Sequence, residues 1–452
     1  MINYVYLFIF FLNFLWSLSL TPYVALSYDS DTDLYEFSNA NFSKYIVGLN
    51  ISHISNKINI ESNISYHLYD YLNRLPNQFN PSPGLGTIEN SPGLQADQFN
   101  FFYSDIMISY LGNKGKVYIG KSNPIWGVGE SKIFLSDKAP PFFNLGYQIK
   151  INDKIYYEHL HGSLDSRIPN STIANSLYDF DSYDVFPQYP RSIAAHRLEI
   201  SFNQKAKLTI LEIIVYGGHR SIEPYYLLPF VPFLPIQTYL GDVDNDMIGF
   251  YFMYNFSDNF NVYSSLLIDE WSPPYTFKKN NKNWAIYKIG LLSNIFSNND
   301  EFGIEYIYSD NRVFKHRFEI NDFYSFNYPV GFWAGPHSDE IFVKYKFNYK
   351  NLDFLISYSN ARRGKLDDEV VLGKYQGEFY NQFSGVVEKK KIISCSVKFK
   401  FNEKYDFAVG YDMINWENAG FDPLYPNDSM LIDLKKNNYF FEFNYNIMKI
   451  NL

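Results

Sequence analysis

The sequence predicts an all-β protein, a transmembrane antiparallel β-barrel of about 18 strands, with about 16 as the fallback count. Three observations predict this fold. One residue in five is aromatic, yet the mean hydropathy is slightly negative at −0.25. Apolar and polar side chains alternate along many short segments. Short and long connections between these segments also alternate, which is typical of barrels with short periplasmic turns and long extracellular loops.

The alternation is clearest near the C-terminus. Tyr439, Phe441 and Phe443 lie on one face of the segment 439–447, and Glu442 and Asn444 lie on the other. The segments 405–413, 302–308 and 260–268 repeat this pattern. Because successive side chains of a strand point to opposite faces, each segment has one apolar and one polar face. The strands of a β-sandwich would show the same alternation, so the lengths of the connections have to distinguish a sandwich from a barrel.

The connections fall into two classes that alternate along the chain. Short ones are expected near residues 55–57, 111–114, 151–154, 203–206, 257–259, 297–300, 349–352 and 402–405. Long ones are expected near residues 73–97, 122–146, 165–191, 217–245, 271–283, 310–338, 361–390 and 416–437. They separate about 17 strands, and a bacterial single-chain barrel usually has an even number. We expect the missing strand before residue 44, where Leu34 to Phe37 is a candidate.

The N-terminus predicts export to the bacterial outer membrane. The first 27 residues carry no charge, and an apolar run extends from Tyr4 to Leu18. This predicts a signal peptide over 1–27, with a single barrel domain over 28–452. Cleavage is expected after Ser27 or, at an earlier site, after Ser19. An uncleaved membrane anchor is the alternative. No later segment approaches the roughly 18 apolar residues of a membrane-spanning helix.

Charge and cysteine content exclude several classes of function. The net charge of −9 argues against a nucleic-acid partner, which would select a basic face. The single cysteine, Cys395, permits no internal disulfide and no multi-cysteine metal site.

The sequence offers no convincing catalytic or metal site, so we expect no enzyme, no metal and no cofactor. His159 and His161 would share a strand face, but two histidines without a third ligand are a weak metal signal. Asp242, Asp244 and Asp246 have calcium-loop spacing but lack the glycine and the glutamate of an EF-hand. No GxSxG motif and no phosphate-binding loop is present.

Several charged and aromatic residues near expected strand ends are candidates for binding a polysaccharide. Aromatic rings stack on sugar faces, and charged groups at the mouth of a barrel would meet a polar glycan. The candidates are Trp126, Arg191, Arg197, Arg220, Glu270, Trp271 and Trp333. The alternatives are a salt-bridge network inside the barrel and an aromatic girdle at the membrane interface.

Two long connections have unusual compositions. Residues 124–142 contain Trp126 and two glycines, Gly127 and Gly129, which allow close backbone approach. We expect this stretch to be a structural loop that folds over or into the barrel mouth. Residues 217–245 are apolar and rich in proline, so they should neither join the sheet nor stay in water. We expect them to fold inward as a constriction, or to pack on a partner.

The loop 124–142 resembles the corresponding loop of the Wzi family of capsule-assembly outer-membrane proteins. The matching residues are Gly120, Trp126, Gly127, Gly129, Phe134, Leu135 and Ser136, followed by residues 139–142. The segments 194–200, 213–218, 239–252, 262–271 and 328–340 look like family segments in family order. The resemblance covers residues 100–350 well, and the remainder only by architecture.

The resemblance implies a barrel of 18 strands with a sugar-recognising outer surface that helps to retain capsular polysaccharide on the cell. It also implies a helical N-terminal plug, which the sequence lacks because strands begin by about residue 45. The loop 217–245 is the expected substitute. The implied partners are capsular or exopolysaccharide, outer-membrane lipid and the barrel-assembly machinery. The alternative functions are a porin-like diffusion channel for small solutes or oligosaccharides and, well behind it, a lipid or glycan hydrolase.

Overall fold

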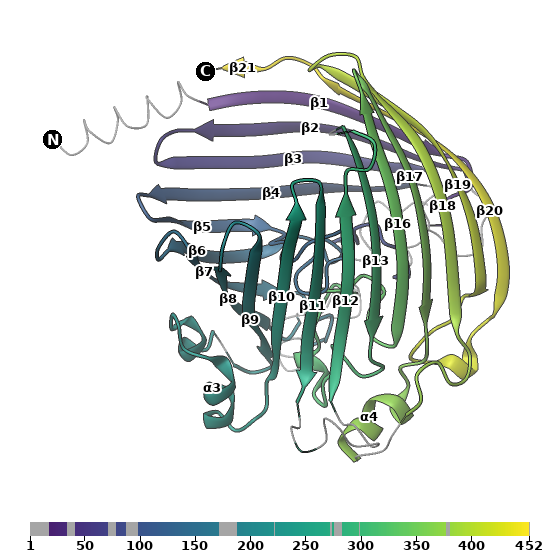
Figure 1. Cartoon of the computed structure of the whole chain (residues 1–452). Helices are drawn as coiled ribbons and strands as arrows, with labels where there is room; N and C mark the ends of the chain where they lie inside the picture. Colours follow the sequence, from purple (N-terminus) through teal and green to yellow (C-terminus); the bar gives the residue numbers. More distant parts are fainter. Residues whose placement is uncertain are drawn as a thin grey trace, which may run out of the picture.

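The strands of the protein form one closed cylinder (Figure 1). A computed structural model describes residues 18–33, 41–70, 78–86, 98–170, 188–220, 222–271, 274, 283–297, 299–376 and 380–451. Within these residues no helix is long and apolar enough to cross a membrane.

The wall of the cylinder consists of 18 antiparallel strands in chain order. They are β1 (Leu18–Asp29), β2 (Phe42–Ile54), β3 (Ile58–Asp70), β4 (Gln98–Gly112), β5 (Gly115–Ser122), β6 (Phe142–Lys150), β7 (Ile155–Leu164), β8 (Arg191–Ser201), β9 (Ala206–Gly217), β10 (Asn245–Ser257), β11 (Phe260–Glu270), β12 (Trp284–Ser293), β13 (Asp300–Ser309), β16 (Ser338–Tyr349), β17 (Leu352–Arg363), β18 (Glu388–Lys400), β19 (Tyr405–Ala419) and β20 (Ile432–Asn446). The cylinder closes where β20 pairs with β1, from Asn446 opposite Tyr23 to Phe440 opposite Asp29. The predicted fold and strand count are confirmed.

The predicted alternation of short and long connections is also confirmed. All eight short turns lie on one rim, which is the periplasmic rim in outer-membrane barrels, and the long loops lie on the extracellular rim. The first strand, however, is β1 at Leu18–Asp29. The candidate strand Leu34 to Phe37 lies outside the described residues. Because β1 overlaps the segment predicted as a signal peptide, the barrel begins before the boundary expected after Ser27.

Alternation along the strands separates a lipid face from a lumen face, as predicted. The outward face carries exposed apolar side chains such as Ile304, Tyr306, Val409 and Phe441. The inward face of β5 to β13 packs on one large buried apolar cluster, to which loops from the extracellular side also contribute. Alternating side chains along one strand therefore meet either lipid or this inner core.

The connection between β5 and β6, residues 123–141, folds into the barrel, and we call it the lumen loop. The Nζ of Lys288 donates to the carbonyl oxygens of Val128 and Ser131, each at 2.6 Å. Lys288 is also ion-paired with Glu305 at 3.0 Å. Glu305 in turn accepts from the backbone N–H of Glu130 at 2.7 Å. Two opposite charges from β12 and β13 thus bind the loop through its backbone, and the expected inward fold is confirmed.

Glycine is required where the lumen loop meets this ion pair. Gly129 has φ of +84°, and a Cβ built there would lie 1.8 Å from Oε1 of Glu305. Gly218 has a similar φ of +88°, but a Cβ there would meet nothing within 4 Å. The two glycines have similar φ values and differ in the space around them.

The connection between β9 and β10 folds the other way, which corrects the expectation of a constriction. Its short helices η2 (Pro224–Leu227) and α3 (Phe233–Tyr239) pack against Ala194, Ile214 and Tyr216. These three alternate with Ile193, Ile213 and Val215, which face the inner core. Since alternate residues of a strand point to opposite faces, the connection lies on the outer wall of the barrel. Figure 1 shows α3 beside β9. We call residues 222–244 the outer flap.

Smaller elements lie in the remaining extracellular connections. These are η4 (Glu319–Asn321), β14 (Tyr324–Ser325), β15 (Tyr328–Pro329), α4 (Asp368–Gln376) and η5 (Pro426–Asp428). A short strand, β21 (Ile450–Asn451), follows β20 and pairs with the start of β1.

The position of β1 gives a prediction about N-terminal processing. Cleavage after Ser27 would remove residues 18–27, which pair with β2 and, from Tyr23 onward, with β20. We expect the chain 18–452 to refold in detergent into a barrel with heat-modifiable electrophoretic mobility, and the chain 28–452 to fail. N-terminal sequencing of the exported protein should find a start at or before Leu20. A mature protein that starts at residue 28 would contradict this prediction.

The close approach at Gly129 gives a second prediction. Gly129→Ala should destabilise the barrel by about 1–3 kcal/mol more than Gly218→Ala, because only the first variant forces atoms together. The control variant carries the same backbone penalty for a side chain at positive φ. The measurement is the free energy of unfolding in urea for both variants and the wild type. Equal losses would show that the loop does not depend on the contact with Glu305.

Candidate functional site

A cavity of about 720 Å³ lies at the extracellular mouth of the barrel, and we call it the mouth cavity. Its lining comes from extracellular strand ends and loops. The connection between β13 and β16, residues 310–337, supplies most of it, and we call this connection the hairpin loop. Further lining comes from Gln78, Ser166, Arg191, Arg363 and residues 420–424.

The hairpin loop has a strained tip that faces the mouth cavity. Its strands β14 and β15 pair through Ser325 and Tyr328, so Phe326 and Asn327 form a two-residue turn. Both turn residues have positive φ, +52° and +64°. Two-residue hairpin turns favour this geometry, but a bulky aromatic residue rarely adopts it. Such strain persists only where the surrounding structure enforces it, and it concentrates at functional sites.

Arg191, at the extracellular end of β8, enforces the shape of the hairpin loop. Its guanidinium donates to the carbonyl oxygens of Ile320, Tyr324 and Glu319 at 2.7, 2.8 and 2.7 Å. The side chain is buried. Because each of its three nitrogens donates to a backbone oxygen, Arg191 positions the loop.

Two further cations of the mouth cavity, Lys315 and Arg363, are ion-paired. Lys315 forms an ion pair with Asp322 at 2.5 Å. Arg363 is ion-paired with Glu388 and donates to the carbonyl oxygen of Phe421 at 3.2 Å. These two cations are thus neutralised by buried carboxylates, whereas Glu319 and Asp422 of the lining are exposed.

Lys138, from the lumen loop, lies below the mouth cavity. Its Nζ donates to the carbonyl oxygens of Asn80 and Ser82 at 2.6 and 2.8 Å, and it lies 4.9 Å from the ring centre of Tyr328. Burial, together with the positive charges of Lys390 and Arg363, lowers the pKa of Lys138 to about 7. Burial thus disfavours the charged form of this lysine.

The lining also offers a ligand partly exposed aromatic surface and neutral polar groups. Tyr324, Phe326 and Tyr328 contribute rings to the lining. Gln78 and Asn327 are exposed, and their amides have no hydrogen-bond partner among the described residues. Flat rings beside free amides are suited to sugars, whose faces are apolar and whose edges carry hydroxyl groups.

The structure brings together only some of the seven candidates predicted from the sequence. Arg191 and Trp333 line the mouth cavity, where Trp333 is buried and donates from its Nε1 to Glu340 at 3.0 Å. Trp126 is 2% exposed inside the barrel. The guanidinium of Arg197 lies 4.9 Å from the ring centre of Trp126 and pairs with Glu158 at 2.6 Å.

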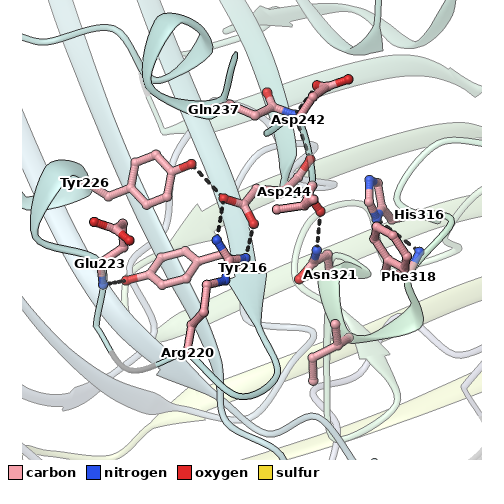
Figure 2. A network of polar contacts seen from close by, with 12 residues as sticks. Tyr216, Arg220, Glu223, Tyr226, Gln237, Asp242, Asp244, His316, Phe318 and Asn321 are labelled. Atoms are coloured by element: carbon pink, nitrogen blue, oxygen red, sulfur yellow. Dashed lines mark hydrogen bonds and ion pairs between the residues drawn. The ribbon is translucent and has the colours of Figure 1, made fainter. Parts of the chain in front are cut away.

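The other three candidates lie apart from the mouth cavity. Arg220 is ion-paired with Asp244, whose carboxylate also accepts from the hydroxyl of Tyr226 at 2.7 Å (Figure 2). This network belongs to the outer flap. Glu270 and Trp271 are exposed at the extracellular end of β11, and Trp271 is 57% exposed. The expected internal salt-bridge network accounts for Arg197 more directly than a glycan contact does.

Sequence reasoning did not single out the hairpin tip. The stretch 322–328 has four aromatic residues in a long extracellular connection, and this density was the available signal. Among the described residues, no group of three or more His, Cys, Asp or Glu side chains is placed to hold a metal ion. His159 and His161 do share a face, and that face is the outer wall of the barrel.

No family model matches the chain, and no curated protein sequence matches it. Among solved structures, the chain is similar to Wzi from Escherichia coli, described as an outer membrane protein involved in group 1 capsule assembly and as a carbohydrate-binding β-barrel. That similarity has a TM-score of 0.58 and 12% identity, over 95% of this chain and 84% of that chain. The outer membrane protein opdK from Pseudomonas aeruginosa has a TM-score of 0.50 and 9% identity, over 97% and 100%. The structural resemblance to Wzi is confirmed, and at these identities it concerns the fold.

His337, next to the mouth cavity, gives a prediction on pH dependence. Its Nδ1 lies 2.6 Å from the carbonyl oxygen of Lys365, and its Nε2 accepts from the N–H of Phe383 at 2.7 Å. Burial lowers the pKa of His337 from 6.5 to about 4. The unfolded chain therefore binds a proton below about pH 6.5, whereas the folded chain resists it. The contribution of His337 to the free energy of unfolding is therefore fully present above pH 6.5, and it is lost as the pH falls from 6.5 to 4.

The test compares the wild type with His337→Gln. The advantage of the wild type in free energy of unfolding should shrink by about 2–3 kcal/mol between pH 7.5 and 4.5. The comparison cancels groups common to both proteins, such as Asp310, whose pKa burial raises to about 6. An advantage that is the same at both pH values would show that His337 does not titrate in this way.

Proposed function

We propose that this protein is a non-enzymatic outer-membrane barrel that binds capsular or exopolysaccharide at its mouth cavity and helps to attach it to the cell surface. The observation that carries the proposal is the lining of the cavity, where the partly exposed rings of Tyr324 and Phe326 accompany the exposed amides of Gln78 and Asn327. The chemistry fits stacking on sugar rings, with hydrogen bonds to hydroxyl groups. The solved neighbour described as a carbohydrate-binding barrel supports the same class of ligand.

The interior of the barrel favours an anchor over a diffusion channel. The lumen loop and the hairpin loop both contribute to the large buried cluster inside the cylinder, through Trp126, Phe134, Val330 and Phe332. The two loops are joined where the hydroxyl of Ser136 donates to the carbonyl oxygen of Gly331 at 2.6 Å. A glycan held at the mouth needs no path through this packing, whereas a diffusing solute does.

The proposed function predicts that changes at the tip of the hairpin loop, Phe326 and Asn327, weaken polysaccharide binding. The double variant Phe326→Ala/Asn327→Ala should weaken binding of the purified barrel to the capsular polysaccharide of its own strain by about tenfold or more. The reason is that it removes one ring and one free amide. The measurement is calorimetric titration, with polysaccharide shed into the medium as the cellular readout. Tyr425→Ala, which removes an exposed extracellular ring outside the cavity, should leave both unchanged.

Two outcomes would contradict the proposal. If the tip variant binds as tightly as the wild type, the mouth cavity is not the binding site. If the intact barrel binds no polysaccharide and gives steady single-channel conductance in a planar bilayer, the diffusion channel becomes the better account. Replacing residues 128–134 by a glycine–serine linker then shows whether the lumen loop limits that current.

A further inference from the structure

The outer flap lies beside strands that are just long enough to cross a bilayer. β8 has 11 residues and β9 has 12, and a tilted membrane strand needs about 9–11. The flap leaves the extracellular end of β9, and the backbone N–H of Phe233 donates to Glu212 at 2.8 Å, near the middle of that strand. Its contact nearest the periplasmic rim is the hydrogen bond from the backbone N–H of Phe230 to the hydroxyl of Tyr157, at 3.0 Å. Tyr157 is the third residue of β7 from the periplasmic rim.

The flap covers a polar patch on the outer wall. His159, His196 and Glu212 face outward on adjacent strands, with His159 opposite His196 and His196 opposite Glu212. His196 lies 3.0 Å from the carboxylate of Glu212, and its ring centre is 4.4 Å from that of Phe233. Both ring nitrogens of His159 are buried without a hydrogen-bond partner. Polar groups of this kind are costly against lipid, so a cover at mid-height has a clear physical role.

The outer surface of the flap is apolar. From Pro224 to Tyr239 the sequence has no charged residue. The exposed large apolar side chains are those of Tyr225, Leu227, Leu228, Phe230, Leu234 and Tyr239. The neighbouring strands carry exposed apolar side chains of the same kind, such as Leu145 on β6 and Phe250 on β10. The apolar band of the barrel therefore continues across the flap.

The upper end of the flap is anchored by polar contacts. Figure 2 shows Arg220 and Tyr226 converging on Asp244, while the backbone N–H of Glu223 donates to the hydroxyl of Tyr216 at 3.0 Å. Asn321 of the hairpin loop donates to the carbonyl oxygen of Val243 at 2.6 Å. The charged groups gather toward the extracellular end, and the uncharged stretch extends toward mid-height. This is the polarity of a segment that enters a bilayer from one side.

We propose that the outer flap lies within the hydrocarbon layer of the membrane, with lipid acyl chains as its partner, and replaces the wall of β7 to β9 as the lipid-facing surface. The backbone of the flap can be accommodated there because its helices and its contacts with Glu212 and Tyr157 satisfy backbone groups. The strands beneath are thereby free to carry histidine and carboxylate at a depth where lipid would otherwise exclude them.

The proposal is tested by the depth of fluorescent labels. Bimane is attached to Ile222→Cys, Phe230→Cys or Leu234→Cys in a Cys395→Ser background, in dioleoylphosphatidylcholine vesicles containing phosphatidylcholine brominated at defined acyl positions. We expect bromine to quench the labels at 230 and 234 strongly and iodide to quench them weakly. The label at 222 should report a shallower depth. Three separate labelling positions are used because a single substitution could itself displace the flap.

The chain supplies matched controls. The native Cys395 is exposed on the outward face of β18, opposite Ile356, and reports a lipid-facing position. Tyr425→Cys reports an extracellular one. Iodide quenching at 230 and 234 equal to that at 425 would overturn the proposal, since the flap would then lie in water. Protection from both quenchers together with intermolecular cross-linking would also overturn it, because a second copy would then be the partner.

Discussion

The buried ion pair between Lys288 and Glu305 is the contact on which the interior of this barrel depends. Both groups also form hydrogen bonds with backbone atoms of the lumen loop, and Glu305 accepts a further one from the hydroxyl of Tyr263. Removing one partner of such a pair typically costs about 3–5 kcal/mol, because the other charge is left buried. The charges of the wall thus fix the loop, the loop supports the hairpin loop, and the hairpin loop shapes the mouth cavity.

The barrel uses the two faces of its strands in different ways over β7 to β10. Inward residues pack on the lumen loop, whereas the outward residues of β7 to β9 pack on the outer flap. In the inner core, the charges of Lys288 and Glu305 are compensated by each other and by backbone groups of the lumen loop. On the outer wall of β8 and β9, the polar residues His196 and Glu212 lie beneath Phe233 of the flap. One strand segment can therefore have two buried faces, which is unusual for a membrane strand.

The sequence predicted the strands well because their alternation is a local property, visible without knowledge of the partner strand. It predicted the inward course of the lumen loop from glycine and tryptophan content. The roles of Arg191 and Trp126 were not accessible, because the partners of Arg191 lie 128 to 133 residues further along the chain. The direction of the flap was missed for a related reason. The apolar composition of the flap would suit either the lumen or the outer wall. The residues that indicate the outer wall are His159 and His161, which lie on the lipid face of β7 and need a cover.

The junction of β20 with β1 is the one place in the wall where neighbouring strands have no connecting turn. Backbone pairing closes it, an ion pair between Lys436 and Asp31 lies beside it, and further contacts join residues such as Ser30 and Tyr439, which are 409 positions apart in the sequence. Closing a loop of this length carries a large entropic cost that no early contact repays. The cylinder therefore becomes complete only when the last strand is in place, and until then its first strand has a free edge that must be kept from other chains.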